Sequence, residues 1–172
     1  MQVLYGISGG IAAYKAPEVV RALRRAGHGV RCVVTASASR LVASDALAAV
    51  SGMPVATTMW PGDGGMPHIE LARWCDALLV APVTADLLAR FALGLADDLL
   101  TTVFLALEPA KRVALAPAMN TVMWQKPVVQ GHVSTLRAAG ARIIAPVPGD
   151  LACGETGIGA LAPIEAIVAA LA

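Results

Sequence analysis

Short apolar runs alternate along the chain with segments in which apolar residues recur every three or four positions. The short runs, bounded by glycine, proline or polar residues, are typical of parallel strands covered on both faces. The periodic segments are typical of amphipathic or buried helices. The expected strands are Gln2–Ile7, Val30–Thr35, Ala77–Ala81, Arg112–Ala116 and Arg142–Ala145, with a weaker one at Pro54–Thr57. The expected helices are Ala16–Ala26, Thr84–Leu93, Leu99–Leu107, Val128–Ala139 and Ile164–Leu171.

This alternation of strand and helix predicts a single α/β domain over residues 1–172. We expect three layers, with a doubly wound parallel sheet between helices and right-handed crossovers. Ligands of such sheets bind beyond the carboxyl ends of the strands, so unusual residues at those ends are candidate site residues. They are Ser8, Thr35, Pro82, Thr84 and Asn120.

Two long segments, Met59–Pro67 and Pro146–Pro163, show neither strand nor helix periodicity and are rich in glycine and proline. Irregular segments of this length are uncommon in compact domains. We therefore expect them to be functional flaps or lids.

The composition is unusually apolar: 57% of the residues are hydrophobic and 15% are charged. No apolar run approaches the roughly 18 residues that a membrane helix requires. We therefore expect the excess to be buried between the subunits of a homo-oligomer. The alternative is that the many alanine residues, which are counted as hydrophobic, account for the high percentage.

Charge and cysteine content exclude several classes of protein. A net charge of +1 does not provide the excess of basic residues that is typical of nucleic-acid-binding proteins. The start MQVLY lacks the basic region of a signal peptide. Three cysteines without a CxxC pair argue against both a disulfide framework and a metal site. We expect a reduced, cytoplasmic protein in which Cys32 and Cys75 are core residues.

The glycine-rich stretch 6–10, with the sequence GISGG, allows two interpretations. It matches the G-x-S-x-G turn of a serine hydrolase, in which Ser8 would be the nucleophile. It also matches a strand-to-helix turn whose free backbone N–H groups bind a phosphate. A hydrolase needs a later acid and histidine, and only His68 is an attractive base. Because Ser8 follows the first expected strand rather than a later one, the phosphate interpretation is favoured.

The expected second strand ends in Thr35-Ala36-Ser37, which supplies two hydroxyl groups and no acidic residue. A dinucleotide usually requires an acidic residue there for its ribose. A mononucleotide such as FMN suits this end of the sheet better.

Four segments together resemble the flavin-dependent cysteine decarboxylases, and they occur in the family's order over nearly the whole chain. They are GISGGIAAYK (6–15), HIELARWCDALLVAPVTADLLA (68–89), APAMNTVMW (116–124) and LACGETGIGALA (151–162). The resemblance implies a flavodoxin-like (Rossmann-like) fold, trimers that often pack into dodecamers, and FMN at a subunit interface. The FMN-binding residues that it implies are Ser8, Gly9, Gly10, Ile11, Ala12, Thr35, Ser37, Pro82, Thr84, Ala85, Asp86, Leu87 and Ala118.

The chemistry implied by the resemblance is an oxidative decarboxylation. FMN first oxidises the carbon that bears sulfur to a thioaldehyde, whose C=S group accepts electrons as CO2 leaves and an enethiol forms. His68 is then the base, Asn120 binds the substrate carboxylate, and Cys153 donates a proton when the enethiol is reduced. We expect His68 and Asn120 to lie close to the same flavin.

The resemblance also suggests which residues contact the substrate. Arg73 is either a cation for the carboxylate or a solvated helix residue. The implied substrate-binding residues are Asn120, Met119, Arg73, Leu151 and Ala152.

The substrate itself stays open. The coenzyme A branch of the family decarboxylates 4′-phospho-N-pantothenoylcysteine to 4′-phosphopantetheine, and Cys153 in its A-C-G-E loop favours that branch. The alternative is a peptidyl-cysteine decarboxylase, which forms a C-terminal enethiol (aminovinyl-cysteine) in modified-peptide natural products. Non-catalytic regulators of the family carry long acidic tails, which this sequence lacks.

Overall fold

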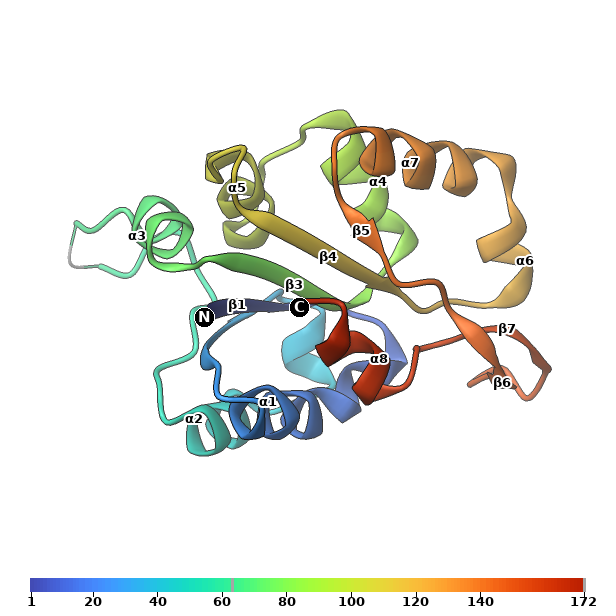
Figure 1. Cartoon of the computed structure of the whole chain (residues 1–172), viewed down its shortest axis with the longest axis horizontal. Coiled ribbons are helices and arrows are strands. Elements are labelled where there is room, and N and C mark those ends of the chain that lie inside the picture. Colours follow the sequence, from blue (N-terminus) through green and yellow to red (C-terminus); the bar gives the residue numbers. More distant parts are fainter. Residues whose placement is uncertain (63, 172) are drawn as a thin grey trace.

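The computed structural model describes residues 1–62 and 64–171, and it contains a five-stranded parallel sheet in the order β2-β1-β3-β4-β5 (Figure 1). All neighbouring strands in this sheet are parallel. The strand order reverses direction between β1 and β3, which is the switch point at which such sheets bind ligands. This is the flavodoxin-like order, so the predicted fold class is confirmed. The sheet strands are β1 (Gln2–Ile7), β2 (Gly29–Val34), β3 (Ala77–Val83), β4 (Arg112–Pro117) and β5 (Arg142–Ile143).

Helices cover both faces of the sheet, which gives the three predicted layers (Figure 1). One layer holds α1, α2 and α8, and the other holds α3, α4, α5 and α7. The helices are α1 (Ala16–Arg25), α2 (Ser44–Ser51), α3 (Pro67–Trp74), α4 (Ala85–Leu93), α5 (Leu99–Ala106), α6 (Thr121–Gln125), α7 (Pro127–Ala138) and α8 (Ile164–Ala169), with short 3-10 helices η1 (Ile11–Lys15) and η2 (Ala38–Arg40).

The centre of the sheet is apolar on both faces because each layer of helices buries one set of alternate side chains. All seven residues of β3 are buried. Leu79 packs into the core on the α1 side, whereas Leu78 and Val80 pack into the core on the α4 side. The two-sided burial explains why the strand reads as a continuous apolar run rather than as an alternating one.

Helix α4 begins directly at the end of β3 and so fixes one side of the switch point. Thr84 caps it, because its Oγ1 accepts a hydrogen bond from the backbone N–H of Leu87 at 3.2 Å. Gly94 ends the helix in the left-handed conformation, with a φ of 69°. Helix α5 begins with a capping box between Asp98 and Thr101. These caps give α4 and α5 defined starts beside the strand ends.

Two sequence-based expectations are corrected by the structure. The segment Pro54–Thr57 is not a full strand: it forms a single parallel bridge, between Ala56 and Val33 of β2. Pro54 has no N–H to extend the ladder. The segment Pro146–Pro163 is not irregular throughout, since it contains an antiparallel hairpin of β6 (Val147–Asp150) and β7 (Thr156–Ala160). Asp63, in the other segment expected to be irregular, lies outside the described residues.

Candidate active site

The turn after β1 is fixed by the hydroxyl group of Ser8. This side chain is only 2% exposed. Its Oγ donates to the carbonyl oxygen of Pro82 at 2.9 Å and accepts from the N–H of Thr84 at 3.1 Å. The hydroxyl group therefore ties the end of β1 to the end of β3. No histidine lines the cavities beside Ser8 among the described residues, so the hydrolase interpretation is not supported.

Gly9 lies against the end of the neighbouring strand. A Cβ atom on Gly9 would overlap the Cβ atom of Ser37, so only glycine lets these two loops approach so closely. Thr35 stabilises the second loop, since its Oγ1 accepts a hydrogen bond from the N–H of Ala38 at 3.3 Å. The two loops form the floor of a cavity of about 510 Å³. We call it the hydroxyl cavity; its lining includes Ser8, Gly9, Thr35, Ser37, Thr57, Thr84, Asp86, Leu87, Arg90 and Asp98.

Arg90 is the only basic side chain among the described residues that line the hydroxyl cavity. It is held by two carboxylates: Nε donates to Asp86 Oδ2 at 2.9 Å, and Nη1 donates to Asp97 Oδ1. The hydrogen bond from Arg90 lowers the pKa of Asp97, and the same bond raises the pKa of Arg90. The guanidinium is thus fixed in direction at the rim of the cavity.

A second cavity, of about 400 Å³, lies on the other side of the same turn. We call it the hairpin cavity, because the tip of the β6–β7 hairpin lines it. Gly9 and Thr84 line both cavities, so the two meet at the switch point. Its lining includes Gly10, Ile11, Ala12, Tyr14, Lys15, Ala85, Ala118, Met119, Asn120, Met123, Asp150, Leu151, Ala152 and Cys153.

The hairpin is anchored beside the end of β4. The N–H of Met119 donates to the carbonyl oxygen of Gly159 at 3.0 Å. A Cβ atom on Gly159 would overlap the carbonyl oxygen of Met119, so this approach requires glycine. The contact places the hairpin tip over Asn120, which follows Met119 in the chain.

Asn120 and Cys153 meet in the hairpin cavity. Asn120 caps α6, since its Oδ1 accepts from the N–H of Val122 at 2.8 Å. Its Nδ2 lies 3.4 Å from Cys153 Sγ and donates to Glu155 Oε2 at 2.9 Å. An amide donor and a thiol, from elements more than 30 positions apart in the sequence, therefore face one another. This pair can bind a carboxylate and present a proton beside it.

His68 does not join this pair within one chain. It lies near the start of α3 and lines neither cavity. In Figure 1, α3 lies at the left end of the molecule, whereas β6 and β7 lie at the right end. Within one chain, α3 packs against α5 over the β2 side of the sheet, so His68 lies apart from Asn120. The expectation that both residues lie close to the same flavin stays a prediction. The buried Nδ1 of His68 has no hydrogen-bond partner among the described residues.

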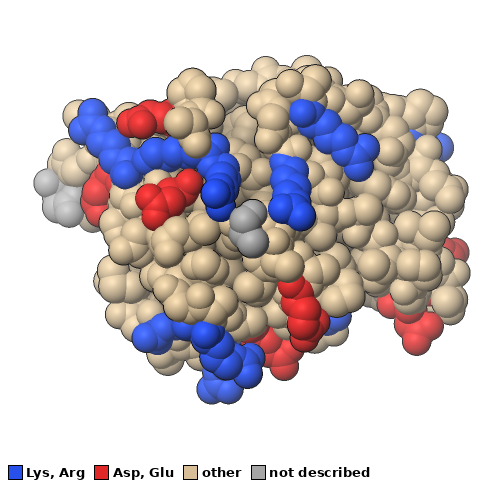
Figure 2. Space-filling model, in the orientation of Figure 1, with Lys and Arg blue, Asp and Glu red and all other residues tan. Residues whose placement is uncertain are grey.

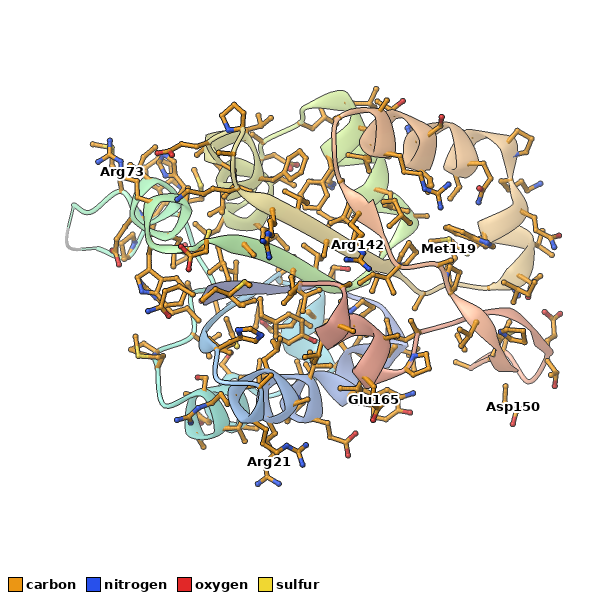
Figure 3. The ribbon with its side chains drawn as sticks, in the orientation of Figure 1. Arg21, Arg73, Met119, Arg142, Asp150 and Glu165 are labelled. Atoms are coloured by element: carbon orange, nitrogen blue, oxygen red, sulfur yellow. The ribbon has the colours of Figure 1, made fainter. Side chains whose placement is uncertain are left out.

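Arg73 lies in the same distant region. Figure 3 shows it at the opposite end of the molecule from Met119 and Asp150. Its side chain is exposed on α3, as a solvated helix residue would be. Of the two interpretations left open by the sequence, a cation for the carboxylate is therefore not supported within a single chain.

All but one of the remaining predicted site residues line one of the two cavities. Thr35, Ser37, Asp86 and Leu87 line the hydroxyl cavity. Pro82 lines neither cavity: it is buried in β3 and supports the turn through its carbonyl oxygen. The residues predicted to line the hairpin cavity, and found there, are Gly10, Ile11, Ala12, Ala85, Ala118, Met119, Asn120, Leu151, Ala152 and Cys153.

Sequence reasoning missed several residues of the site. Tyr14 and Lys15 end the first of the four motifs, and both line the hairpin cavity. Arg90 follows the second motif directly. Glu155 lies within the fourth motif and contacts Asn120. Each lies within or next to a recognised segment, but only the tertiary structure gives it a partner.

The three cysteines are free and differ in environment. Cys32 and Cys75 are buried, as predicted. Burial raises the pKa of Cys32 to about 12 and also raises the pKa of Cys75. Cys153 is exposed at the hairpin tip.

We expect iodoacetamide at neutral pH to add one group per native chain, on Cys153, because thiolate character and exposure both govern alkylation. Intact-mass spectrometry measures the number of adducts. Cys153→Ser should remove the fast adduct. Three fast adducts on the native protein would contradict the burial of Cys32 and Cys75.

Other kinds of site find no support in the structure. Across the described residues, no helix combines the length and apolarity needed to span a bilayer. The same residues hold no group of three or more histidine, cysteine or acidic side chains that could bind a metal ion. On the face drawn in Figure 2, described basic side chains occur in separate groups rather than in one continuous stripe.

The two cavities fit a mononucleotide with a hydroxyl-bearing chain. Together they offer neutral hydroxyl groups, the exposed backbone of Gly9 and Gly10, and an apolar wall that includes Ile11 and Leu161. Each has a volume within the usual range of small-molecule sites, about 300–1,000 Å³. The absence of a side chain on Gly9 lets the turn after β1 pack against Ser37, and the backbone N–H groups of such a strand-to-helix turn can bind an anionic group.

Comparisons with known proteins agree with this geometry. The Flavoprotein family matches residues 1–172. The coenzyme A biosynthesis bifunctional protein CoaBC of Mycobacterium tuberculosis is 46% identical over 166 residues, which are 96% of this chain and 39% of that protein. The chain thus spans about two fifths of the length of the curated relatives that it matches.

Two solved structures are similar over nearly their whole length. One is a cysteine-to-serine mutant of PPC decarboxylase in complex with pantothenoylaminoethenethiol; it has a TM-score of 0.86 and 34% identity, and the match covers 98% of this chain and 94% of that one. The other is the FMN-dependent cysteine decarboxylase SpaF, with a TM-score of 0.83, 34% identity and coverage of 100% and 98%. The resemblance predicted from the four motifs is confirmed, and the chain belongs to the Flavoprotein family.

Proposed function

We propose that this protein is an FMN-dependent cysteine decarboxylase that converts 4′-phospho-N-pantothenoylcysteine to 4′-phosphopantetheine. The observation that carries the proposal is the meeting of the Asn120 amide and the Cys153 thiol in a cavity that adjoins a hydroxyl-lined one. A carboxylate-binding donor, a proton donor and a mononucleotide cradle are three of the parts that this reaction requires.

The chain would hold FMN across the switch point. The backbone of Gly9 and Gly10 and the hydroxyl groups of Thr35 and Ser37 suit its phosphate and ribityl chain. At the start of α4, Thr84 lines both cavities and Ala85 lines the hairpin cavity. When bound, FMN supplies a two-electron acceptor and donor for the carbon that bears sulfur.

Within the hairpin cavity, Asn120 and Cys153 have separate roles. The Asn120 Nδ2 group donates hydrogen bonds to the substrate carboxylate and orients the bond that breaks as CO2 leaves. The Cys153 thiol, 3.4 Å from that nitrogen, donates a proton to carbon as the enethiol is reduced. The apolar side chains of Met119 and Leu151 line the same cavity and limit access of water.

His68 would reach this site from a second copy of the chain. The proposed assembly is a trimer, or a dodecamer built from such trimers, in which α3 of one copy lies beside the hairpin cavity of the next. The apolar side chains that are exposed in a single chain would be available for burial in such an assembly. Among the most exposed are Ile11, Tyr14, Trp60, Met66, Leu93, Leu95, Leu105, Val122 and Val128.

The choice of substrate follows from the relatives and from Cys153. The curated relatives are named as coenzyme A biosynthesis proteins, and one solved neighbour is named PPC decarboxylase. The second candidate is a peptide that ends in cysteine. The similarity to SpaF, which is named only as an FMN-dependent cysteine decarboxylase, fits either substrate and keeps this candidate open. The cytoplasmic location inferred from the cysteine content stays a prediction.

One assay separates these candidates. The purified protein is first examined for the absorbance of bound FMN, and each substrate is then offered in turn and the products are weighed. The proposal predicts 4′-phosphopantetheine, which is the substrate minus CO2. A peptide lighter by CO2 and two hydrogen atoms would support the second candidate. A colourless protein that turns over neither compound would overturn both.

Cys153→Ser is expected to stop the reaction at the enethiol. Serine keeps the size of the side chain but is a far weaker proton donor than a thiol. We expect loss of CO2 to continue and formation of 4′-phosphopantetheine to fall by about 10²-fold or more. Mass spectrometry of the product, which would be lighter by two hydrogen atoms, measures the change. Full reduction by the variant would exclude Cys153 as the proton donor.

A further inference from the structure

The orientation of the Asn120 side chain is fixed by its own backbone. Its Oδ1 accepts the N–H of Val122 at 2.8 Å as the cap of α6. With the oxygen directed at this N–H, the NH2 group is the part of the amide that contacts Cys153 and Glu155. That group can donate but cannot accept, so it selects for an acceptor such as a carboxylate.

A carboxylate of the chain already binds this NH2 group. Glu155 Oε2 accepts from Asn120 Nδ2 at 2.9 Å. The same oxygen accepts from Cys153 Sγ at 3.5 Å. One oxygen of Glu155 therefore contacts both groups that the proposed function assigns to the substrate. The contact of Glu155 with Asn120 is the one expected of a substrate carboxylate.

The turn that carries Glu155 is closed without the help of this side chain. The N–H of Leu151 donates to the carbonyl oxygen of Glu155 at 2.8 Å, and the N–H of Gly154 donates to the carbonyl oxygen of Leu151 at 2.9 Å. Gly154 has a φ of 83°, which permits the tight turn. Glu155 itself is exposed. Its side chain can rotate into solvent while the hairpin tip keeps its shape.

We propose that Glu155 is a substrate-mimicking gate: its carboxylate occupies the Asn120 amide in the free protein and leaves when the substrate carboxylate binds. The proposal rests on the role given to Asn120 under the proposed function. Two carboxylates on one NH2 group repel each other, so binding is an exchange rather than an addition.

The exchange treats substrate and product differently. A substrate carries the carboxylate that replaces Glu155 on Asn120. The decarboxylated product carries none, so Glu155 regains the amide as soon as CO2 has left. Glu155 thereby lowers the apparent affinity for any ligand that must bind the Asn120 amide. The reduction grows with the fraction of protein molecules in which Glu155 occupies that amide.

Two analogues of the substrate test this difference in the full, FMN-loaded protein. The first is 4′-phospho-N-pantothenoylserine, whose hydroxyl group replaces the thiol and prevents turnover. The second is 4′-phospho-N-pantothenoylethanolamine, which also lacks the carboxylate. Calorimetry should show that Glu155→Ala binds the serine analogue about five- to tenfold more tightly than the wild type. The affinity for the ethanolamine analogue should change less than about twofold.

Matched variants separate the gate from a general effect of charge. Glu165 is likewise an exposed glutamate, but it lies on α8 and lines neither cavity. Glu165→Ala should leave the affinity for the serine analogue within about twofold of the wild type. In an Asn120→Ala background, Glu155→Ala should no longer tighten binding. Equal tightening by Glu165→Ala, or none by Glu155→Ala, would overturn the proposal.

The gate can also be decided independently of the substrate. If no variant binds either analogue, the substrate assignment fails. A crystal structure of the unliganded, FMN-loaded protein then decides the gate. A Glu155 carboxylate within hydrogen-bond distance of Asn120 Nδ2 supports it, and one beyond about 3.5 Å overturns it.

Discussion

Replacing His68 by asparagine is expected to lower the rate of decarboxylation by about 10²–10⁴-fold while the protein keeps its FMN. His68 lies near the start of α3 and lines neither cavity, so its loss leaves the cradle intact. An imidazole can accept a thiol proton near neutral pH, and an amide cannot. Steady-state kcat and the flavin-to-protein absorbance ratio are the measurements.

The prediction has a second, sharper part, because His68 and Asn120 lie in separate regions of one chain. If a second copy supplies His68, then His68→Asn and Asn120→Ala variants, each inactive alone, should form some complete sites when expressed together. If equal amounts of the two variants assemble at random, about a quarter of the sites should contain both the native His68 and the native Asn120. Activity near a quarter of the wild-type value is therefore expected.

His132 provides the matched control. It lies on α7, is partly buried and lines neither cavity. His132→Asn should retain activity within about twofold of the wild type. Wild-type rates in His68→Asn would exclude it as the base. No recovery in co-purified mixed oligomers would exclude a site shared between copies.

Gly9→Ala is expected to yield a folded protein that binds FMN more weakly than the wild type. The added Cβ atom would overlap Ser37, so the loops after β1 and β2 must separate. Gly9 lines both cavities, so any separation changes the floor of each. We expect FMN affinity to fall at least about tenfold, equivalent to about 1.4 kcal/mol of binding free energy.

Fluorescence titration of released FMN measures this loss, and circular dichroism checks that the fold survives. Gly131→Ala is the control, because a Cβ atom at this exposed position on α7 meets nothing within 4 Å. That variant should bind FMN as the wild type does. A yellow Gly9→Ala protein with unchanged affinity would show that the close approach to Ser37 is not needed for the cofactor.

The sequence alone determined the parts of this protein that depend on neighbours along the chain. The apolar runs predicted the five sheet strands to within two residues at either end, because a strand covered on both faces must be continuously apolar. The strand-to-helix turns identified Gly9, Thr35 and Thr84, because the ends of parallel strands meet at one edge. Exposure of Cys153 and burial of Cys32 also agreed with their local sequences.

Only the tertiary structure decided which distant residues meet. The sequence motif suggested that His68 and Asn120 belong to one site, but the packing of α3 against α5 separates them in a single chain. The pairing of Glu155 with Asn120 depends on the docking of the hairpin beside Met119, 40 positions from Gly159. A local sequence pattern indicates which face of a helix or strand is apolar. Which elements then contact each other depends on how the side chains of several distant segments pack together.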